Sequence, residues 1–362
     1  MRFLPVAGLL LCVLSTAAGP QQAAGDQATL TVSTTLVEVP ALVKTKGGEL
    51  VFELTADDFG LTDNGVVQRL TLEQDTDVQP VAMVVVVETG GAGARHLEDY
   101  AKLGPVLDSL IGSVEHRVAL VGADSAPHLL VPFSADTDAA AAALANVDAG
   151  DNGAAILDGL VFAIGQLRVQ PARYRREILL LSETIDQGST SSLAEALRLI
   201  SDTNTEIYSF GFSSTRSAVS HEASKLQSTT PGPEHGCFSK EGADKEYDGH
   251  YSAQVLDCLS QLAPPLRLAT MTYLTARNAL RTNTAESLAR LTGGEFVHFH
   301  DAKDLQRGLI AISNDLPNRY VLTFRPTSLT PGAHALHLVL KDRPQLELKS
   351  RSAYWIDDET AH

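Results

Sequence analysis

The stretch VVVVETGGAG, residues Val84–Gly93, decides the fold of this chain. Four consecutive valines predict a strand that is buried on both faces, and continuous apolar runs of this kind are typical of parallel sheets. The run ends in Glu88 and a glycine-rich turn. Because ligands on parallel α/β sheets bind beyond the carboxyl ends of the strands, this turn is the first candidate site.

Strand-like and helix-like segments alternate around this strand over residues 80–317. The helix-like segments carry apolar residues at helical spacing, and Pro105 predicts a kink in the first of them. We therefore expect an α/β domain with a doubly wound, mainly parallel sheet and helices on both faces. The strand-like runs are Pro80–Glu88, His116–Ala123, His128–Phe133, Arg176–Ser182, Glu206–Phe212 and Glu295–His300.

The two ends of the chain have a different pattern. Residues 29–78 alternate with period two, include the run Leu50–Leu54 and carry Asn64-Gly65, a strong hairpin signal. Residues 319–356 are also β-rich, and we expect the two ends to pack together into one sandwich-like domain. The strand-like runs of the second end are Arg319–Pro326, Ala333–Lys341 and Leu346–Trp355.

Charge limits the class of partner. The 362 residues include 44 acidic and 28 basic side chains, for a formal net charge of -16. Such a surface repels nucleic acids and anionic membranes over most of its area. Proteins, cations and neutral ligands are the partners that remain.

The N-terminus predicts export from the cytoplasm. Arg2 precedes an apolar run from Phe3 to Leu14 and then small residues, which is the pattern of a secretory signal peptide over residues 1–18, cleaved near Ala18. Lipidation of Cys12 is disfavoured because Leu11 precedes it. No second apolar span follows, so we expect a secreted or periplasmic protein without a membrane span in the mature chain.

An irregular stretch interrupts the alternation over residues 213–265 and is interpreted as an insertion loop. It contains Cys237 and Cys258, and an even number of cysteines in an exported chain favours a disulfide, worth about 3 kcal/mol on the loop-entropy model. A zinc site that adds His235 and His250 is the alternative. Its spacing differs from that of a zinc finger, and the compartment favours the disulfide.

The order of these elements resembles a von Willebrand factor A-type (VWA) domain, the fold of integrin I domains. More closely, the chain resembles the secreted bacterial VWFA-related proteins best known from Acidobacteria, over roughly residues 30–355. The phrases that carry the resemblance are LTADDFGLTDNGVVQRL (Leu54–Leu70), SLARLTGGEFVHFHDAKDLQRGLIAISNDLPNRYVLTFRP (Ser287–Pro326) and the ending Ser352–Trp355.

The resemblance implies a metal-ion-dependent adhesion site that this sequence lacks in part. The family's Asp-x-Ser-x-Ser, Thr and Asp positions match Glu88, Gly90, Ala92, Ala154 and Glu183. Three hydroxyls are therefore missing, while Mg²⁺ requires a near-octahedral set of oxygen ligands. We expect a degenerate site without a cofactor, in which Mg²⁺ or Mn²⁺ is disfavoured and would have only Glu88 and Glu183 as ligands.

Two roles for Glu88 remain open. Its carboxylate accepts hydrogen bonds from backbone N–H groups of the Gly90-Gly91 turn or faces solvent, or it makes a polar contact with a partner. For catalysis, the sequence contains no G-x-S-x-G, no G-x-G-x-x-G at this turn and no P-loop motif. His298 and His300 share one face of a strand, but no carboxylate pair supports a metal site there.

These observations predict a secreted, non-enzymatic protein-interaction module with a degenerate metal site. We expect a protein partner at the strand-end rim, defined as Glu88–Ala92, Asn152–Ala154 and Glu183–Asp186. The alternative is a metal-dependent adhesion domain that uses the two glutamates. An enzyme that uses the rim is a third interpretation.

Overall fold

The computed structural model describes residues 36–73, 79–111, 114–212 and 283–358. The predicted signal peptide (1–18), the insertion loop (213–265) and the cysteine pair Cys237 and Cys258 lie outside the described residues.

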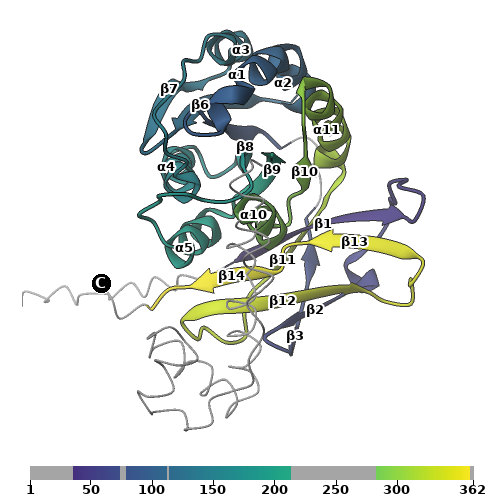
Figure 1. Cartoon of the computed structure of the whole chain (residues 1–362). Coiled ribbons are helices and arrows are strands. Elements are labelled where there is room, and N and C mark those ends of the chain that lie inside the picture. Colours follow the sequence, from purple (N-terminus) through teal and green to yellow (C-terminus); the bar gives the residue numbers. More distant parts are fainter. Residues whose placement is uncertain (1–35, 74–78, 112–113, 213–282, 359–362) are drawn as a thin grey trace, which may run out of the picture. The chain divides into compact units, whose positions relative to one another are not determined.

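A six-stranded sheet forms the centre of the α/β domain, in the order β10-β9-β8-β5-β6-β7 (Figure 1). Its neighbouring strands are parallel, except that β7 is antiparallel to β6. The predicted doubly wound, mainly parallel sheet is confirmed. The strands are β5 (Val81–Glu88), β6 (His116–Ala123), β7 (Pro127–Ser134), β8 (Arg175–Glu183), β9 (Glu206–Phe212) and β10 (Phe296–His298).

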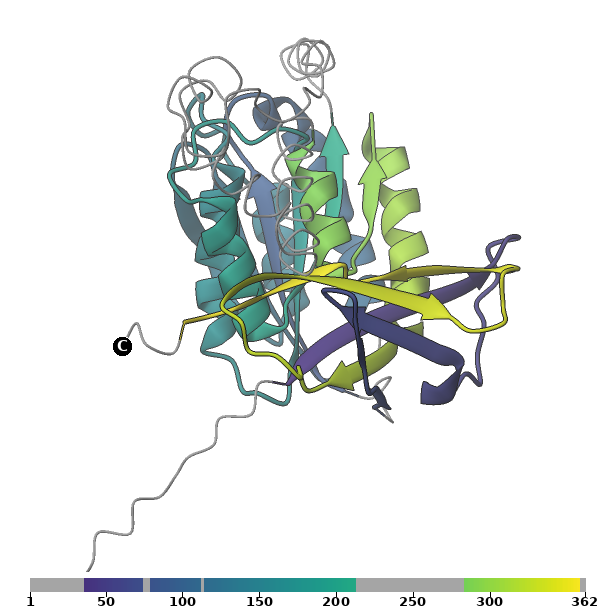
Figure 2. The same cartoon turned by 90° about the horizontal axis from the view of Figure 1, so that it is seen from below.

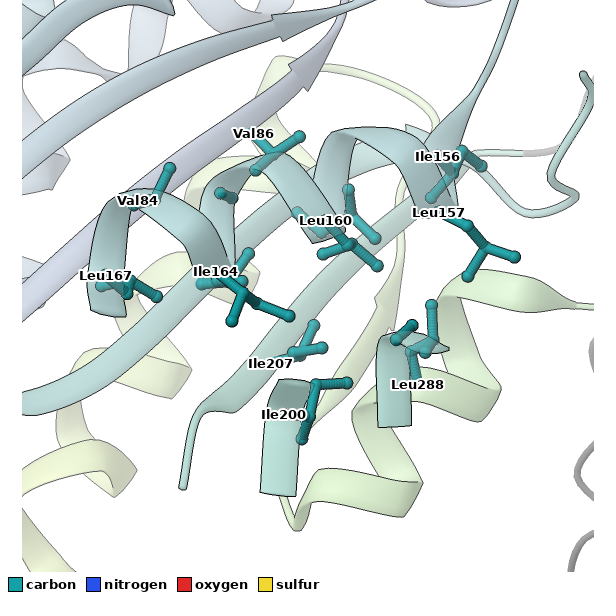
Figure 3. Close-up of a cluster of buried hydrophobic side chains, with 14 of the residues drawn as sticks. Val84, Val86, Ile156, Leu157, Leu160, Ile164, Leu167, Ile200, Ile207 and Leu288 are labelled. Carbon is teal, nitrogen blue, oxygen red and sulfur yellow. The ribbon is translucent and has the colours of Figure 1, made fainter. Parts of the chain in front are cut away.

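Helices cover both faces of this sheet because β5 is apolar at every position before Glu88. Val84 and Val86 pack into one core with α4, α5 and α10, whereas Val85 and Val87 pack into a second core with α2, α3 and α11. Figure 3 shows the first core, with Val84 and Val86 beside Leu160 of α4. The helices are α1 (Leu97–Tyr100), α2 (Gly104–Ile111), α3 (Thr137–Ala145), α4 (Ile156–Arg168), α5 (Leu193–Thr203), α10 (Thr284–Thr292) and α11 (Ala302–Asp315).

The segment expected as one helix with a kink at Pro105 is divided further. It forms the 3-10 turn η3 (Gly93–His96), α1, a second 3-10 turn η4 (Ala101–Leu103) and then α2. Pro105 is the second residue of α2, where the missing N–H group breaks no intrahelical hydrogen bond. The proline therefore marks a helix start.

Strands from the two ends of the described chain pair with each other in two four-stranded sheets. β1 lies between β11 and β13, and β12 lies between β2 and β14 (Figure 2). Their inner faces share a core that includes Val39, Phe59, Leu322 and Leu338. The strands are β1 (Val37–Thr45), β2 (Phe59–Asp63), β3 (Val66–Gln68), β4 (Thr71–Leu72), β11 (Tyr320–Phe324), β12 (Gly332–Leu340), β13 (Leu346–Ser350) and β14 (Ala353–Ile356).

The β2–β3 turn is formed by Asn64 and Gly65, as the hairpin signal indicates. Both residues have positive φ angles, 48° and 83°, which a two-residue hairpin turn of this hand requires. Two other strand predictions are wrong. Residues 51–55 form no strand, because Glu53 has a φ of 67° and strand-like bonding to β1 ends at the Val51 N–H. The Tyr320 hydroxyl then donates to the Val51 carbonyl and accepts from the Leu54 N–H.

The run expected as a single strand over Leu346–Trp355 is interrupted at Arg351 and Ser352, which separate β13 from β14. Arg351 turns into the protein and is 2% exposed. A charged side chain that is buried at a strand position breaks the alternation that the sequence pattern assumes.

Among the described helices, none is both long enough and apolar enough to cross a membrane.

The N-terminus of α11 provides a stability prediction. One carboxylate oxygen of Asp301 accepts hydrogen bonds from the backbone N–H groups of Lys303 and Asp304, both at 2.9 Å. We expect Asp301→Ala to lower the free energy of unfolding by about 1 kcal/mol in urea denaturation. The exposed Asp57 is the control, and Asp57→Ala should change the free energy of unfolding by less than about 0.5 kcal/mol. Equal effects of the two variants would show that the cap adds nothing.

Candidate functional site

Glu88 lies at the carboxyl end of β5, beside the end of β8, where the direction of winding of the sheet reverses. Sheets of this type offer their binding sites at this switch point. The side chain is only 1% exposed. Its Oε1 accepts a hydrogen bond from the Gly93 N–H at 2.9 Å, and its Oε2 accepts one from the Glu183 N–H at 2.5 Å. Glu88 therefore joins the turn after β5 to the end of β8.

The glycines of this turn leave no space for a longer side chain. A Cβ atom on Gly90 would lie 2.3 Å from the carbonyl oxygen of Gly153, and one on Gly93 would lie 2.3 Å from the carbonyl oxygen of Glu88. Both distances are far below van der Waals contact. The position that matches the family's first serine is thus filled by the neighbouring loop.

That neighbouring loop, residues 150–155, is bonded directly to the turn. The N–H of Gly91 donates to the Asp151 carbonyl at 2.9 Å, and the N–H of Gly150 donates to the Thr89 carbonyl at 2.9 Å. The Asp151 carboxylate accepts from the N–H groups of Gly153 and Ser125 at 2.7 and 3.0 Å. These bonds, that of Gly153 first, lower the pKa of Asp151.

The loop that follows β8 also bonds to the surroundings of Glu88. Ala154 and Gln187 exchange two backbone hydrogen bonds, at 3.2 and 2.9 Å, and the Gln187 side chain donates to Oε2 of Glu183 at 2.9 Å. Asp186 accepts from the N–H of Leu157 at 3.0 Å, in the first turn of α4. The three loops therefore form one hydrogen-bonded unit above the sheet.

Burial dominates the electrostatics of Glu88. It raises the pKa of the carboxyl to about 7, although the N–H donors of Glu183 and Gly93 oppose the shift, and the negative charge of Glu183 raises the pKa further. Such a group holds a proton over part of the neutral pH range. A site prepared for a cation instead keeps its carboxylates ionised.

The structure brings Glu88, Gly90 and Glu183 together at the strand ends, with Ala154 adjacent and Ala92 half-buried at the start of η3. The prediction that the two glutamates lie on an exposed rim is wrong, because Glu88 and Glu183 are 1% and 2% exposed. They are buried because the described loops around them are bonded to one another. Among the described residues, Gly91, Gly150, Asp151 and Asn152 are exposed there.

The contacts of Glu88 and Gly90 decide whether the residues at the predicted degenerate metal site can ligate a divalent cation. Each oxygen of Glu88 already accepts a backbone N–H, and Gly90 has no room for a hydroxyl-bearing side chain. Within the described residues, no group of three or more His, Cys, Asp or Glu side chains is placed to hold a metal ion. The residues present therefore do not fit a hard divalent cation.

Gly153 was predicted as part of the rim, whereas Asp151 and Gln187 each lie one residue outside its predicted segments. Asp151 and Gly153 stand in the stretch AGDNGA, whose Gly and Asn residues indicate a turn but not its contact with Gly90. The alternative zinc ligands, His235, Cys237, His250 and Cys258, lie outside the described residues.

No protein-family model matches the sequence, and no curated protein matches it. Solved structures similar to the chain include the vWF domain of the type V pili tip protein Mfa5 from Porphyromonas gingivalis, at 21% identity and a TM-score of 0.27, over 30% of this chain and 39% of that chain. BatB from Bacteroides thetaiotaomicron has 11% identity and a TM-score of 0.38, over 65% of this chain and 97% of that chain.

The VWA domain of SpRpn10 has 15% identity and a TM-score of 0.30, over 42% of this chain and 84% of that chain. Likeness at this level carries no function over to the chain. The fold is established by the chain's own strand order and helices, which form a VWA-like, Rossmann-like α/β domain flanked by β sheets.

Proposed function

We propose that the chain is a secreted or periplasmic, non-enzymatic module that binds a protein partner at the strand-end rim, through a degenerate metal-ion-dependent adhesion site. The observation that carries the proposal is the closed hydrogen-bonded unit over Glu88. It leaves Gly91, Gly150, Asp151 and Asn152 as the exposed surface, formed by backbone and short polar side chains. Recognition by shape and hydrogen bonding requires such a fixed surface.

The rest of the proposal follows the sequence. A signal peptide over residues 1–18 and a Cys237–Cys258 disulfide belong to an exported protein, and the resemblance to the secreted VWFA-related proteins agrees with both. We propose β-rich parts at 29–78 and 319–356 around the α/β domain at 80–317. The net charge of -16 disfavours nucleic acid as the partner.

Asn152→Arg tests the rim. The long cationic side chain stands in the middle of the exposed surface, so we expect it to weaken binding of a partner at least about tenfold. Secreted and envelope proteins of the source cell are first captured on the immobilised full chain, and the affinity of each captured protein is then measured for wild type and variants. Asn314→Arg is the matched control, since Asn314 is exposed on the last turn of α11, at the opposite end of the sheet.

Loss of binding in Asn152→Arg alone supports the rim as the contact surface. A captured protein that binds both variants as tightly as wild type contradicts it. Glu88 and Glu183 are unsuitable for this test, because both are buried and offer a partner almost no surface to contact.

The second candidate function is metal-dependent adhesion through Glu88 and Glu183. The observation in its favour is that a backbone hydrogen bond of 2.5 Å brings the two residues together. Titration calorimetry and thermal shift with Mg²⁺, Mn²⁺ and Ca²⁺ decide between the two. Heat and a raised melting temperature that Glu88→Gln abolishes support the metal, and their absence at millimolar ion dismisses it.

A further inference from the structure

A cavity of about 220 Å³ lies at the other end of the sheet, where the starts of β8 and β9 meet β1 and β11. It is far from the strand-end rim. Its charged walls come from four glutamates and three arginines: Glu38, Glu73, Glu177, Glu206, Arg175, Arg176 and Arg351. Leu36, Pro40 and Val321 add apolar surface.

The guanidinium groups around this cavity already have acceptors. Arg175 donates to Oε1 of Glu177 at 2.6 Å. Arg351 donates to the side chains of Ser201 and Asn204 at 3.1 Å. Arg176 also faces backbone carbonyl groups, each at 3.4 Å, those of Leu167, Gln170 and Thr203.

The carboxylates are less completely paired. Glu177 is 2% exposed, and its second oxygen, Oε2, is buried without a hydrogen-bond partner among the described residues. No ion pair to Glu38 is found in the described part of the chain either, and burial raises the pKa of its carboxyl despite the charge of Arg351. A buried carboxylate oxygen without a donor is costly, by about 1–3 kcal/mol or more.

From this arrangement we infer that the cavity binds a small primary ammonium compound with a short aliphatic chain. The ammonium group donates three hydrogen bonds, and the Glu38 carboxylate on the cavity wall offers acceptors that no ion pair among the described residues occupies. The carbon chain lies against Pro40 and Val321. The volume of 220 Å³ is below that of drug-sized ligand pockets and suits a chain of a few carbons.

Charge also selects the ammonium compound over a metal ion. Four carboxylates and three guanidinium groups line the cavity, so its walls carry one formal negative charge in excess, which one ammonium group balances and a divalent cation, which needs about six oxygen ligands, exceeds. A singly charged ammonium requires only two or three acceptors. The acidic net charge of the whole chain attracts organic cations toward the cavity.

The test uses the full chain and three probes of similar size in titration calorimetry and thermal shift. n-Butylammonium carries charge, N–H donors and a chain. 1-Butanol has the chain without the charge, and tetramethylammonium has the charge without N–H donors. We expect a raised melting temperature and measurable heat with n-butylammonium alone at millimolar concentration.

Variants locate the site. Glu38→Gln is expected to weaken n-butylammonium binding about tenfold or more, because it removes the negative charge without adding volume. Glu115→Gln is the control, since Glu115 is exposed and pairs with Arg173 on the surface. No binding of n-butylammonium, equal binding of 1-butanol or tetramethylammonium, or unchanged affinity in Glu38→Gln would each overturn the inference. The probe comparison stands on the wild-type protein alone if the variant fails to fold.

Discussion

Arg351→Met is expected to lower the free energy of unfolding by about 3 kcal/mol in urea denaturation at neutral pH. The guanidinium of Arg351 donates to the side chains of Ser201 and Asn204, each at 3.1 Å. It also donates to the carbonyl oxygens of Glu38 and Ala353 at 3.3 and 2.9 Å. Methionine keeps much of the volume but donates to none of these four acceptors, although the backbone N–H groups of Trp355 and Glu38 still bond Ser201 Oγ and Asn204 Oδ1.

Two opposing effects set the size of this change. Burial lowers the pKa of Arg351 to about 10, so the folded protein holds this charge at a cost of about 3 kcal/mol, which methionine relieves. The variant loses four hydrogen bonds from a charged group, each worth about 1.5–3 kcal/mol. Together these lost bonds outweigh the relief, so the variant is destabilised.

Arg343→Met is the matched control in the same C-terminal segment. Arg343 pairs with Asp58 at 2.7 Å, but its side chain is 40% exposed. Because exposed ion pairs contribute little, we expect a change below about 1 kcal/mol. A more stable Arg351→Met protein would contradict this expectation, because it would show that relief of the buried charge outweighs the lost hydrogen bonds.

The α/β domain was predictable because its signals are local and strong. The strand VAMVVVVE is apolar at every position before its final glutamate, and a strand buried on both faces requires helices on both sides. Asn64-Gly65 predicted its turn for a similar reason, since few residues adopt two successive positive φ angles. Periodicity and turn chemistry determine these elements before any tertiary contact forms.

The contacts of the candidate site were predictable only in part. The Glu88 carboxylate was expected to accept backbone N–H groups of the Gly90-Gly91 turn, but its local donor is the Gly93 N–H, and the N–H of Gly91 bonds the Asp151 carbonyl instead. The other donor belongs to Glu183, which lies 95 residues away in the sequence. No pattern in the sequence predicts this contact, because the contact depends on the register of β5 against β8.

The buried arginines were missed for a related reason. Arg319 and Arg351 stand in runs that are read as β strands with exposed polar positions, yet they are 5% and 2% exposed. Arg319 lies 5.3 Å from the Tyr208 ring centroid and 3.6 Å from Glu206. Residue type alone predicts exposure for arginine, and only the packing of the C-terminal strands against β9 reverses it.

The stability of the protein is expected to fall by about 3 kcal/mol through Glu88 alone as the pH rises from about 4.5 to 8. In the folded protein, burial raises the pKa of Glu88 to about 7 from an ordinary value near 4.5. The folded state therefore binds the proton more tightly than the unfolded state. This contribution is complete below about pH 4.5 and is lost as the pH passes through 7.

Glu88→Gln isolates this contribution from the other titrating groups. Glutamine cannot ionise, and its amide places an N–H donor against the N–H of Gly93 or Glu183, which lowers stability by an amount independent of pH. The difference in unfolding free energy between wild type and Glu88→Gln should therefore shift by about 3 kcal/mol between pH 4.5 and 8, in favour of the variant at high pH. Glu98→Gln, at an exposed position of α1, controls for the loss of one charge. A difference that stays constant over this range would mean that the two N–H donors keep Glu88 ionised. A carboxylate held in that form would restore the case for a cation at the strand ends.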